Sequence, residues 1–209
     1  LLDFWLAEPR MCKHFHIPLQ SGMDLILKKM RRRYLTSWYQ NRVERIKTSH
    51  PHAGIGADVI VGFPGESEDM FQETYDFLQQ LPVSYLHVFT YSERPQTPAA
   101  GFEGFVEPRV RAERSERLRA LSARKRRLFY ESFQGMNINV LFEENRNPGC
   151  LTGLSDEYVR VSVASTEDLR NQIVSVRVTG VHEDECVGEV QRITAQRNFD
   201  IALKNVVAA

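Results

Sequence analysis

The sequence predicts an α/β protein in which part of a βα barrel precedes a small all-β domain. Residues 13–100 alternate apolar strand-like segments with amphipathic helical ones, an order typical of a parallel sheet. After Gly135 the hydrophobic period falls to two, and turn residues separate the short segments. Charge divides the chain at the same place: residues 1–135 carry 20 basic and 16 acidic residues, whereas residues 136–193 carry 5 and 10. Two modules with different surfaces are therefore expected.

The composition is that of a globular protein without a membrane segment. The 209 residues include 42% apolar and 26% charged side chains, and the net charge is zero. No apolar run approaches the roughly 18 residues that span a membrane, and no signal-peptide pattern opens the chain. Cys12, Cys150 and Cys186 lack metal-ligand spacing, and an odd number of scattered cysteines argues against a disulfide framework. We therefore expect a cytoplasmic protein with no membrane partner.

The first strand and two helices occupy the start of the chain. Residues 13–19 predict a strand that runs into a polar loop at residues 20–22. Residues 24–31 and 36–48 carry apolar side chains near helical spacing, with Thr36 as the N-cap of the second helix. These helices lead to the next strand.

Residues 57–62 predict the second strand, because an apolar run rich in β-branched residues fits a strand buried on both faces. A Gly-Phe-Pro-Gly turn follows at residues 62–65, and Ser67 is the expected N-cap of a helix that ends before Pro82. Residues 85–89 predict the third strand. Ligands bind at the carboxyl ends of such strands, where glycine lets the backbone approach a ligand closely. The turn is therefore a candidate ligand site, with a simple strand-ending turn as the alternative.

A loop and a long basic helix follow. The proline-rich residues 93–100 predict a loop on the ligand side, and Pro108 suits the first turn of a helix that reaches about Phe133. The apolar stripe of this helix comprises Leu118, Leu121, Leu128 and Phe129. Residues 109–127 hold nine Arg or Lys residues against two Glu. Such a run is either a solvated helix face or a phosphate-binding surface for RNA, and both interpretations stay open.

The segments after Gly135 predict a small antiparallel barrel or sandwich. Alternating strands are expected at residues 138–142, 158–163 and 173–178, with a weaker one at 187–193. The expected domains are the partial barrel (1–107), a connecting basic helix (108–134), the β-domain (135–193) and a tail (194–209). Three parallel strands cannot close a barrel and leave sheet edges open. We therefore expect a truncated barrel that is partly disordered or pairs edge to edge as a homodimer.

Three sequence blocks carry a family resemblance. They are residues 16–22 (HIPLQSG), residues 58–66 (DVIVGFPGE) and residues 87–100, which begin with HVF and end with TPAA. In this order they resemble the tRNA methylthiotransferase family of radical SAM (S-adenosylmethionine) enzymes, and the last block looks most like the branch that modifies threonylcarbamoyladenosine. Residues 136–193 lie where that family carries a TRAM domain, a small OB-like barrel. The implied fold is a three-stranded part of the radical SAM βα barrel followed by a TRAM-like domain.

The resemblance implies a parent enzyme that adds a methylthio group to a modified adenosine near the anticodon of tRNA. Family members use SAM and hold 4Fe–4S clusters through a Cys-x-x-x-Cys-x-x-Cys loop and three cysteines of an amino-terminal domain. This chain has neither cysteine set, so we expect it to be inactive alone. Its expected partners are tRNA and the missing amino-terminal half of the same protein.

The resemblance also implies positions for SAM and RNA. The turn and Phe89 would flank the adenine, Gln20 and Ser21 would offer polar contacts, and Arg33 would meet the carboxylate. The cofactor residues expected on this basis are Gln20, Ser21, Arg33, Val61, Gly62, Phe63, Pro64, Gly65 and Phe89. The RNA contacts expected from the basic helix and the β-domain are Arg109, Arg111, Arg124, Lys125, Arg126, Arg127 and Arg160.

Several residues and the function as a whole have alternatives. His14 and His16 share one face of a strand and could bind a metal, but we favour a structural or SAM-adjacent role toward the barrel interior and predict no metal site. Glu66 either belongs to the ligand site or favours the N-terminus of the next helix electrostatically. The chain could instead be a non-catalytic nucleotide- or RNA-binding module. It could also belong to a different barrel enzyme that uses the 62–65 turn for a phosphate or another nucleotide.

Overall fold

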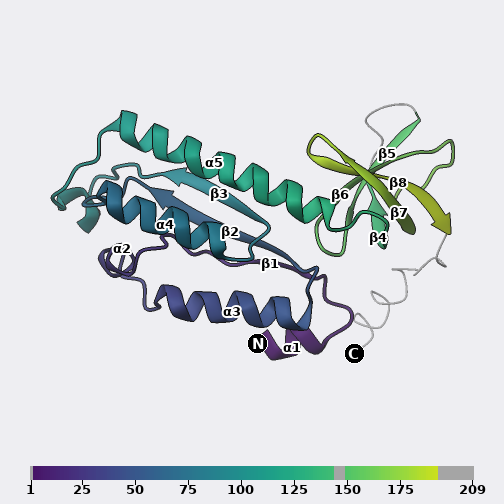
Figure 1. Ribbon diagram of the computed structural model, residues 1–209, viewed down its shortest axis with the longest axis horizontal. Helices are drawn as coiled ribbons and strands as arrows, with labels where there is room; N and C mark the ends of the chain where they lie inside the picture. Colours follow the sequence, from purple (N-terminus) through teal and green to yellow (C-terminus); the bar gives the residue numbers. More distant parts are fainter. Residues whose placement is uncertain (1, 144–148, 193–209) are drawn as a thin grey trace. The chain divides into compact units, whose positions relative to one another are not determined.

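The computed structural model describes residues 2–143 and 149–192, and the chain divides into two units (Figure 1). The first unit ends at Phe129 and the second begins at Tyr130. Most of the basic helix, which we expected to connect the domains, therefore lies in the first unit. The predicted tail (194–209) lies outside the described residues. Within the described ranges, no helix combines the length and the apolar character needed to cross a membrane.

The first unit is built on a parallel sheet of three strands in the order β1-β2-β3, as predicted. The strands are β1 (His14–His16), β2 (Gly54–Val61) and β3 (Tyr85–Thr90). The helices are α1 (Leu2–Ala7), α2 (Asp24–Lys29), α3 (Thr36–Ser49), α4 (Glu68–Gln80), the 3-10 helix η1 (Pro98–Gly101) and α5 (Pro108–Glu131). The sequence did not predict α1 or η1, and β2 begins earlier than expected.

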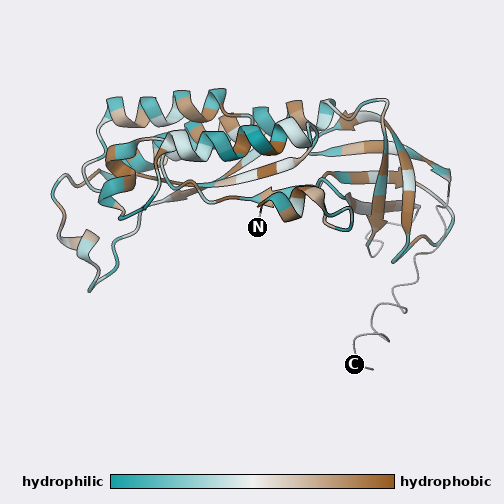
Figure 2. Ribbon diagram, turned by 90° about the horizontal axis from the view of Figure 1, so that it is seen from below, coloured by the Kyte–Doolittle hydropathy of each residue, from teal (hydrophilic) through white to brown (hydrophobic). Residues whose placement is uncertain are grey.

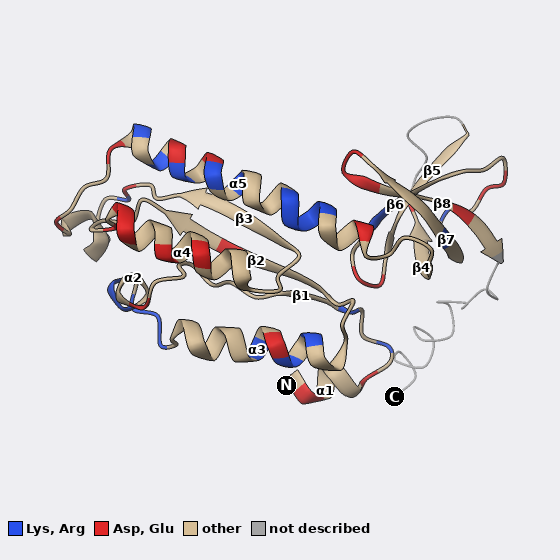
Figure 3. Ribbon diagram, viewed as in Figure 1, with Lys and Arg blue, Asp and Glu red and all other residues tan. Residues whose placement is uncertain are grey.

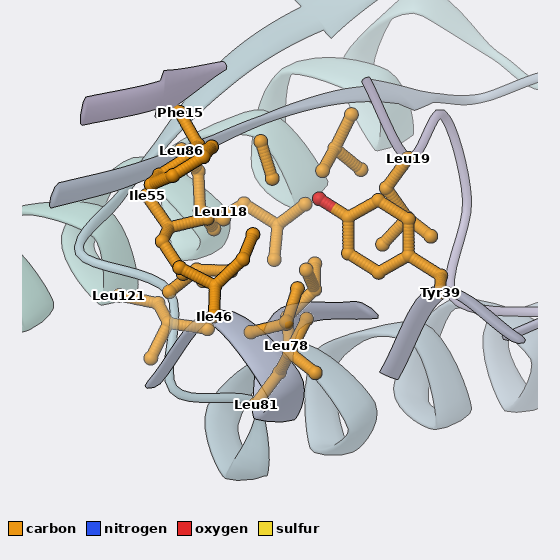
Figure 4. Packing of buried hydrophobic residues seen from close by; sticks show 14 of the residues in the cluster. Phe15, Leu19, Tyr39, Ile46, Ile55, Leu78, Leu81, Leu86, Leu118 and Leu121 are labelled. Atoms are coloured by element: carbon orange, nitrogen blue, oxygen red, sulfur yellow. The ribbon is translucent and has the colours of Figure 1, made fainter. Parts of the chain in front are cut away.

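One face of this sheet packs against helices to form the core (Figure 4). Alternate residues of β2, from Ile55 to Val61, are fully buried. They pack with apolar side chains of α3, α4 and α5, which are Tyr39, Val43, Ile46, Phe71, Leu78, Leu118 and Leu121. The helices carry hydrophobic and hydrophilic residues in alternating bands, as amphipathic helices do (Figure 2). On the opposite face of β2, Asp58 and Ile60 are only half-buried, so the expectation of a strand buried on both faces is wrong.

Helix ends agree with the sequence prediction in part. Ser67 caps α4 as predicted, because its hydroxyl accepts from the Met70 N–H at 3.2 Å. Helix α3 begins at Thr36 but is capped from a distance by Asp24, whose Oδ1 accepts from the Thr36 N–H at 2.8 Å. Leu128, which we expected in the apolar stripe of α5, is 60% exposed and borders a surface cleft. It is therefore not part of the buried stripe.

The β3 edge of the sheet is partly covered by α5. The Ser122 hydroxyl accepts from the Leu86 N–H at 2.8 Å and donates to the Leu86 carbonyl at 3.0 Å. A second copy could not use these two backbone groups without displacing Ser122. Pairing of two copies edge to edge stays a prediction, and the β1 edge is the better candidate for it.

The second unit is a closed barrel with the strand order β4-β5-β6-β8-β7. Its strands are β4 (Asn137–Phe142), β5 (Cys150–Ser155), β6 (Arg160–Ala164), β7 (Ile173–His182) and β8 (Glu185–Arg192). All neighbours pair antiparallel except β6 and β8, which pair parallel. Alternate side chains of β7 point into the barrel, as shown by the complete burial of Val174, Val176 and Val178. The structure thus selects the barrel over the sandwich.

Strand β5 was absent from the sequence prediction because Gly153 interrupts its apolar alternation. A Cβ atom at this position would overlap the carbonyl oxygen of Leu141 in β4. Glycine therefore allows a close approach of the two strands that another residue would prevent.

The three cysteines differ in burial: Cys12 is exposed, Cys150 is half-buried in β5, and Cys186 is buried in the barrel. Burial raises the pKa of the Cys186 thiol to about 12, so this thiol is protonated and unreactive at neutral pH.

Candidate functional site

The side of the sheet away from the helices carries polar and aromatic residues. Side chains alternate along each strand, so residues that avoid the core lie on this side, which we call the open face. Its members are His14, His16, Asp58, Ile60, Tyr85, His87 and Phe89. The parallel register sets Asp58 beside His87. In a βα barrel this side of the strands faces the interior, so its polar groups are placed for ligands rather than for a packed core.

A cleft of about 440 Å³ lies at the carboxyl ends of β2 and β3. It is lined by Gln20, Asp58, Ile60, Phe89, Thr90, Tyr91, Ser92, Arg94, Thr97 and Ala99. Gln20 adopts a left-handed φ of 78°, and its backbone N–H donates to the Asp58 carbonyl at 2.7 Å. Phe89 is 53% exposed and presents its ring to the cleft. Two of the predicted cofactor residues, Gln20 and Phe89, therefore meet at one site.

The glycine-rich turn lies beside this cleft but does not line it. The Gly62 N–H donates to Glu66 Oε2 at 2.7 Å, and a Cβ on Gly62 would overlap the Arg111 side chain. The Gly65 N–H donates to the Gly104 carbonyl at 2.7 Å. A Cβ atom on Gly62 would thus overlap Arg111 and one on Gly65 would overlap the Lys29 side chain, and room for a ligand at this turn stays a prediction.

The other residues of the turn are also enclosed by protein. Val61 is fully buried in the core, and Pro64 is buried as well. Phe63 is 6% exposed and packs edge-on against Tyr91, with 5.2 Å between ring centroids. Their role as cofactor contacts stays a prediction that their side chains do not support.

Two further predicted cofactor residues lie elsewhere. Ser21 is buried, its Oγ accepts from the Met23 N–H at 3.2 Å, and it lies 3.4 Å from Thr74 Oγ1 in α4. Its hydroxyl thus points toward α4 rather than into the cleft. Arg33 is exposed between α2 and α3 and does not line the cleft. Arg94, in contrast, does line the cleft. The sequence indicated this only by placing Arg94 in the loop predicted on the ligand side.

Glu66 joins the turn to α5 through a buried ion pair. Its Oε2 accepts from Arg114 NH1 at 2.8 Å, and the side chains of Glu66 and Arg114 are only 1% and 5% exposed. Burial raises the pKa of Glu66, against the opposing effects of the Gly62 N–H and of Arg114. Arg114 also donates to Glu68 in the first turn of α4. Of the two interpretations of Glu66, the structure favours a structural one.

A histidine and carboxylate cluster occupies the middle of the open face. His16 Nε2 lies 2.9 Å from Asp58 Oδ1, and the rings of His16 and His87 lie 5.2 Å apart. His14 Nε2 lies 2.7 Å from the Tyr85 hydroxyl. The carboxylate partner of His16 is distant in sequence and comes from the neighbouring strand. His16 pairs with Gly56, and Asp58 is the next residue of β2 on the same face.

Basic residues recur along α5 (Figure 3), but only some of them are exposed. The Arg111 guanidinium is buried and donates to the Val106 and Tyr91 carbonyls and to Glu93. Lys125 donates to the carbonyls that end α4, and burial lowers its pKa to about 8. Arg111 is therefore buried and Lys125 half-buried, and their role as RNA contacts stays a prediction that these bonds do not support.

The remaining predicted RNA residues stay accessible. Arg109 is exposed and pairs with Glu113 at 2.9 Å. Arg124 and Arg127 are exposed, and Arg126 is half-buried with its guanidinium near the Tyr85 ring. Arg160 is exposed at the start of β6. These residues are the ones available to an anionic partner.

Comparisons with known proteins agree with the family resemblance of the sequence. A family model described as the Radical SAM superfamily matches residues 3–78. The chain is 38% identical over 173 residues to the threonylcarbamoyladenosine tRNA methylthiotransferase MtaB of Bacillus subtilis, covering 81% of this chain and 38% of the relative. The protein of the same name from Aquifex aeolicus is 44% identical over 147 residues, covering 70% and 36%. The tRNA-2-methylthio-N(6)-dimethylallyladenosine synthase of Wolinella succinogenes is 39% identical over 192 residues, covering 90% and 44%. The chain spans less than half the length of these relatives, and it belongs to the radical SAM tRNA methylthiotransferase family.

Proposed function

We propose that this chain is the part of a tRNA methylthiotransferase that binds the nucleoside of SAM in the cleft at the ends of β2 and β3. The observation that carries the proposal is the cleft itself, which joins an exposed aromatic ring, a polar loop and a cation in a chain of this family. Its volume of about 440 Å³ is within the usual range for small-molecule sites. In this family SAM supplies radical chemistry when it is bound at an iron–sulfur cluster.

The cleft residues suit different parts of SAM. Phe89 offers its exposed ring face to the adenine, since every base can stack on an aromatic side chain. Gln20 offers an amide to the ribose hydroxyls, and Arg94 offers a guanidinium to the carboxylate. The cleft residues therefore bind and orient the cofactor, and the proposal assigns the cluster ligands to parts of the relatives that this chain does not span.

A binding measurement on the chain tests this proposal without iron or reductant. Equilibrium dialysis should detect SAM binding, and Phe89→Ala should weaken it by about 5- to 150-fold, because stacking contributes about 1–3 kcal/mol per base. Phe4→Ala is the matched control, since Phe4 is 58% exposed and does not line the cleft. Equal SAM binding by wild type and Phe89→Ala would contradict the proposal. Equal competition by ATP would favour the alternative of a different nucleotide-binding module.

We further propose that the accessible cations of α5 and the barrel of the second unit, in the manner of a TRAM domain, hold tRNA for methylthio transfer to a modified adenosine. Basic side chains contribute sequence-independent affinity for phosphates. Residues 124–127 are the densest basic run of the chain, and Figure 3 shows them in the second half of α5. The net acidic charge of residues 136–193 limits the contribution of the second unit to local positions such as Arg160.

The salt dependence of tRNA binding tests the RNA surface. Replacing Arg124 and Arg127 together with alanine should weaken binding and reduce the slope of log affinity against log salt by about 1 per phosphate contact removed. The control variant changes Arg10 and Arg45, which are exposed in the first unit and pair with Glu8 and Asp3, and so removes the same charge elsewhere. If both double variants lose affinity and slope equally, only net charge matters and the α5 surface is not the binding site.

A further inference from the structure

We propose that His16, Asp58 and His87 form a site for a divalent transition metal on the open face of the sheet, separate from any cysteine-held cluster. The three side chains come from β1, β2 and β3, one from each strand. One ligand atom from each residue lies within 4.8 Å of the others. This site goes beyond the proposed function, which uses no metal bound by these residues.

The distances fit a metal site that closes by side-chain rotation alone. Zinc bonds to histidine nitrogen and carboxylate oxygen are about 2.0–2.2 Å long, which sets neighbouring ligand atoms about 3–4 Å apart. His16 Nε2 and Asp58 Oδ1 are already 2.9 Å apart. The backbone positions are fixed by the parallel pairing of His16 with Gly56 and of Asp58 with His87. No strand has to move for the three ligands to share one ion.

The ligand set selects the class of metal. Two imidazoles and one carboxylate suit Zn²⁺, Co²⁺ or Fe²⁺, whereas Mg²⁺ and Ca²⁺ prefer oxygen ligands throughout. The side chains of His16 and Asp58 are 39% and 21% exposed, so the ion would keep open positions for water or a substrate. Two histidines and one carboxylate with an open position are the arrangement of catalytic rather than structural sites.

Neighbouring residues hold one ligand in place. The Tyr85 ring packs edge-on against His87, with centroids 5.2 Å apart. Tyr85 is itself fixed by the hydrogen bond to His14 and by Gly56, where a Cβ atom would overlap its ring. Such outer contacts orient a ligating histidine and are a regular feature of metal sites.

Cobalt binding to the chain tests the site directly. After chelator treatment, titration with Co²⁺ should give one equivalent of visible absorption, which Zn²⁺ should abolish by competition. Asp58→Asn and His87→Ala should each weaken Co²⁺ binding at least about tenfold. Both side chains lie on the open face, outside the apolar core, and thermal melting followed by circular dichroism should show that each variant stays folded. His182→Ala, which removes an exposed histidine of the second unit, should leave Co²⁺ binding unchanged.

Two results would overturn the proposal. The first is the absence of stoichiometric Co²⁺ binding by the folded wild-type chain. The second is binding that persists in both Asp58→Asn and His87→Ala, which would place the ion elsewhere and leave His16 and Asp58 as a simple hydrogen-bonded pair. The measurement uses neither SAM nor a cluster, so its failure would leave the cofactor proposal intact.

Discussion

Replacing Arg114 with alanine is expected to destabilise the first unit by about 3–5 kcal/mol, because it leaves a buried carboxylate without its cation. Glu66 is 1% exposed at its side chain, and Arg114 is its ion-pair partner at 2.8 Å. The same guanidinium donates to the Glu66 carbonyl at 3.0 Å, so the variant also loses the link between the turn and α5. Urea unfolding followed by tryptophan fluorescence reports on this unit, since both tryptophans, Trp5 and Trp38, lie within it.

Arg117→Ala is the matched control on the same helix. Arg117 also forms an ion pair, with Glu68 at 2.7 Å, but its side chain is 41% exposed. Exposed pairs of this kind contribute about 0–1 kcal/mol. Equal losses for the two variants would mean that burial of the Glu66 pair has no energetic consequence, contrary to the expectation.

The loss in Arg114→Ala should grow as the pH rises. Burial raises the pKa of Glu66 in the folded protein, and Arg114 opposes this effect. Without Arg114 the folded pKa rises further above the unfolded value, so the folded state binds more protons in the window between them. Stability is then fully present below the unfolded pKa of about 4.3 and falls as the pH rises toward the folded pKa. Unfolding of wild type and variant at pH 4 and pH 7 checks the sign.

The sequence predicted the elements of the fold better than the contacts of the site. Strand and helix patterns are local, so β2, α4 and β3 could be identified from hydrophobic period and from Ser67 as a cap. Strand β5 was missed because Gly153 is required by the neighbouring β4, which no local pattern reveals. The closed barrel likewise depends on pairing between distant strands, although its alternating segments were visible.

Contacts of the site could not be predicted where they depend on the register between strands or on a distant helix. Asp58 becomes the partner of His16 only because parallel pairing aligns β1 with β2. Arg111 belonged to a basic run, and nothing local distinguished a buried guanidinium from its exposed neighbours such as Arg109. The glycines of the turn do lie where a Cβ atom would overlap other atoms, but the sequence could not identify those atoms.

Gly62→Ala is expected to destabilise the first unit by about 2–5 kcal/mol, from the cost of a left-handed alanine and from overpacking. Gly62 has φ +76°, and a Cβ atom there would overlap the Arg111 side chain. Arg111 cannot move away cheaply, because its guanidinium is buried and bonded to two carbonyls and to Glu93. Urea unfolding of the chain without any ligand measures the loss by tryptophan fluorescence.

Gly101→Ala separates this effect from the general effect of adding a methyl group. A Cβ atom on Gly101 would meet nothing within 4 Å, so its replacement should change stability by no more than about 0.5 kcal/mol. If Gly62 existed only to admit a ligand, Gly62→Ala would weaken SAM binding and cost the ligand-free chain no more than a left-handed alanine does, about 1–2 kcal/mol. A larger loss of stability without ligand instead means that the glycine is needed for Arg111. Because Arg111 bonds to the Tyr91 carbonyl, and Tyr91 lines the cleft, Gly62 would then act on the cofactor site through the packing that supports it.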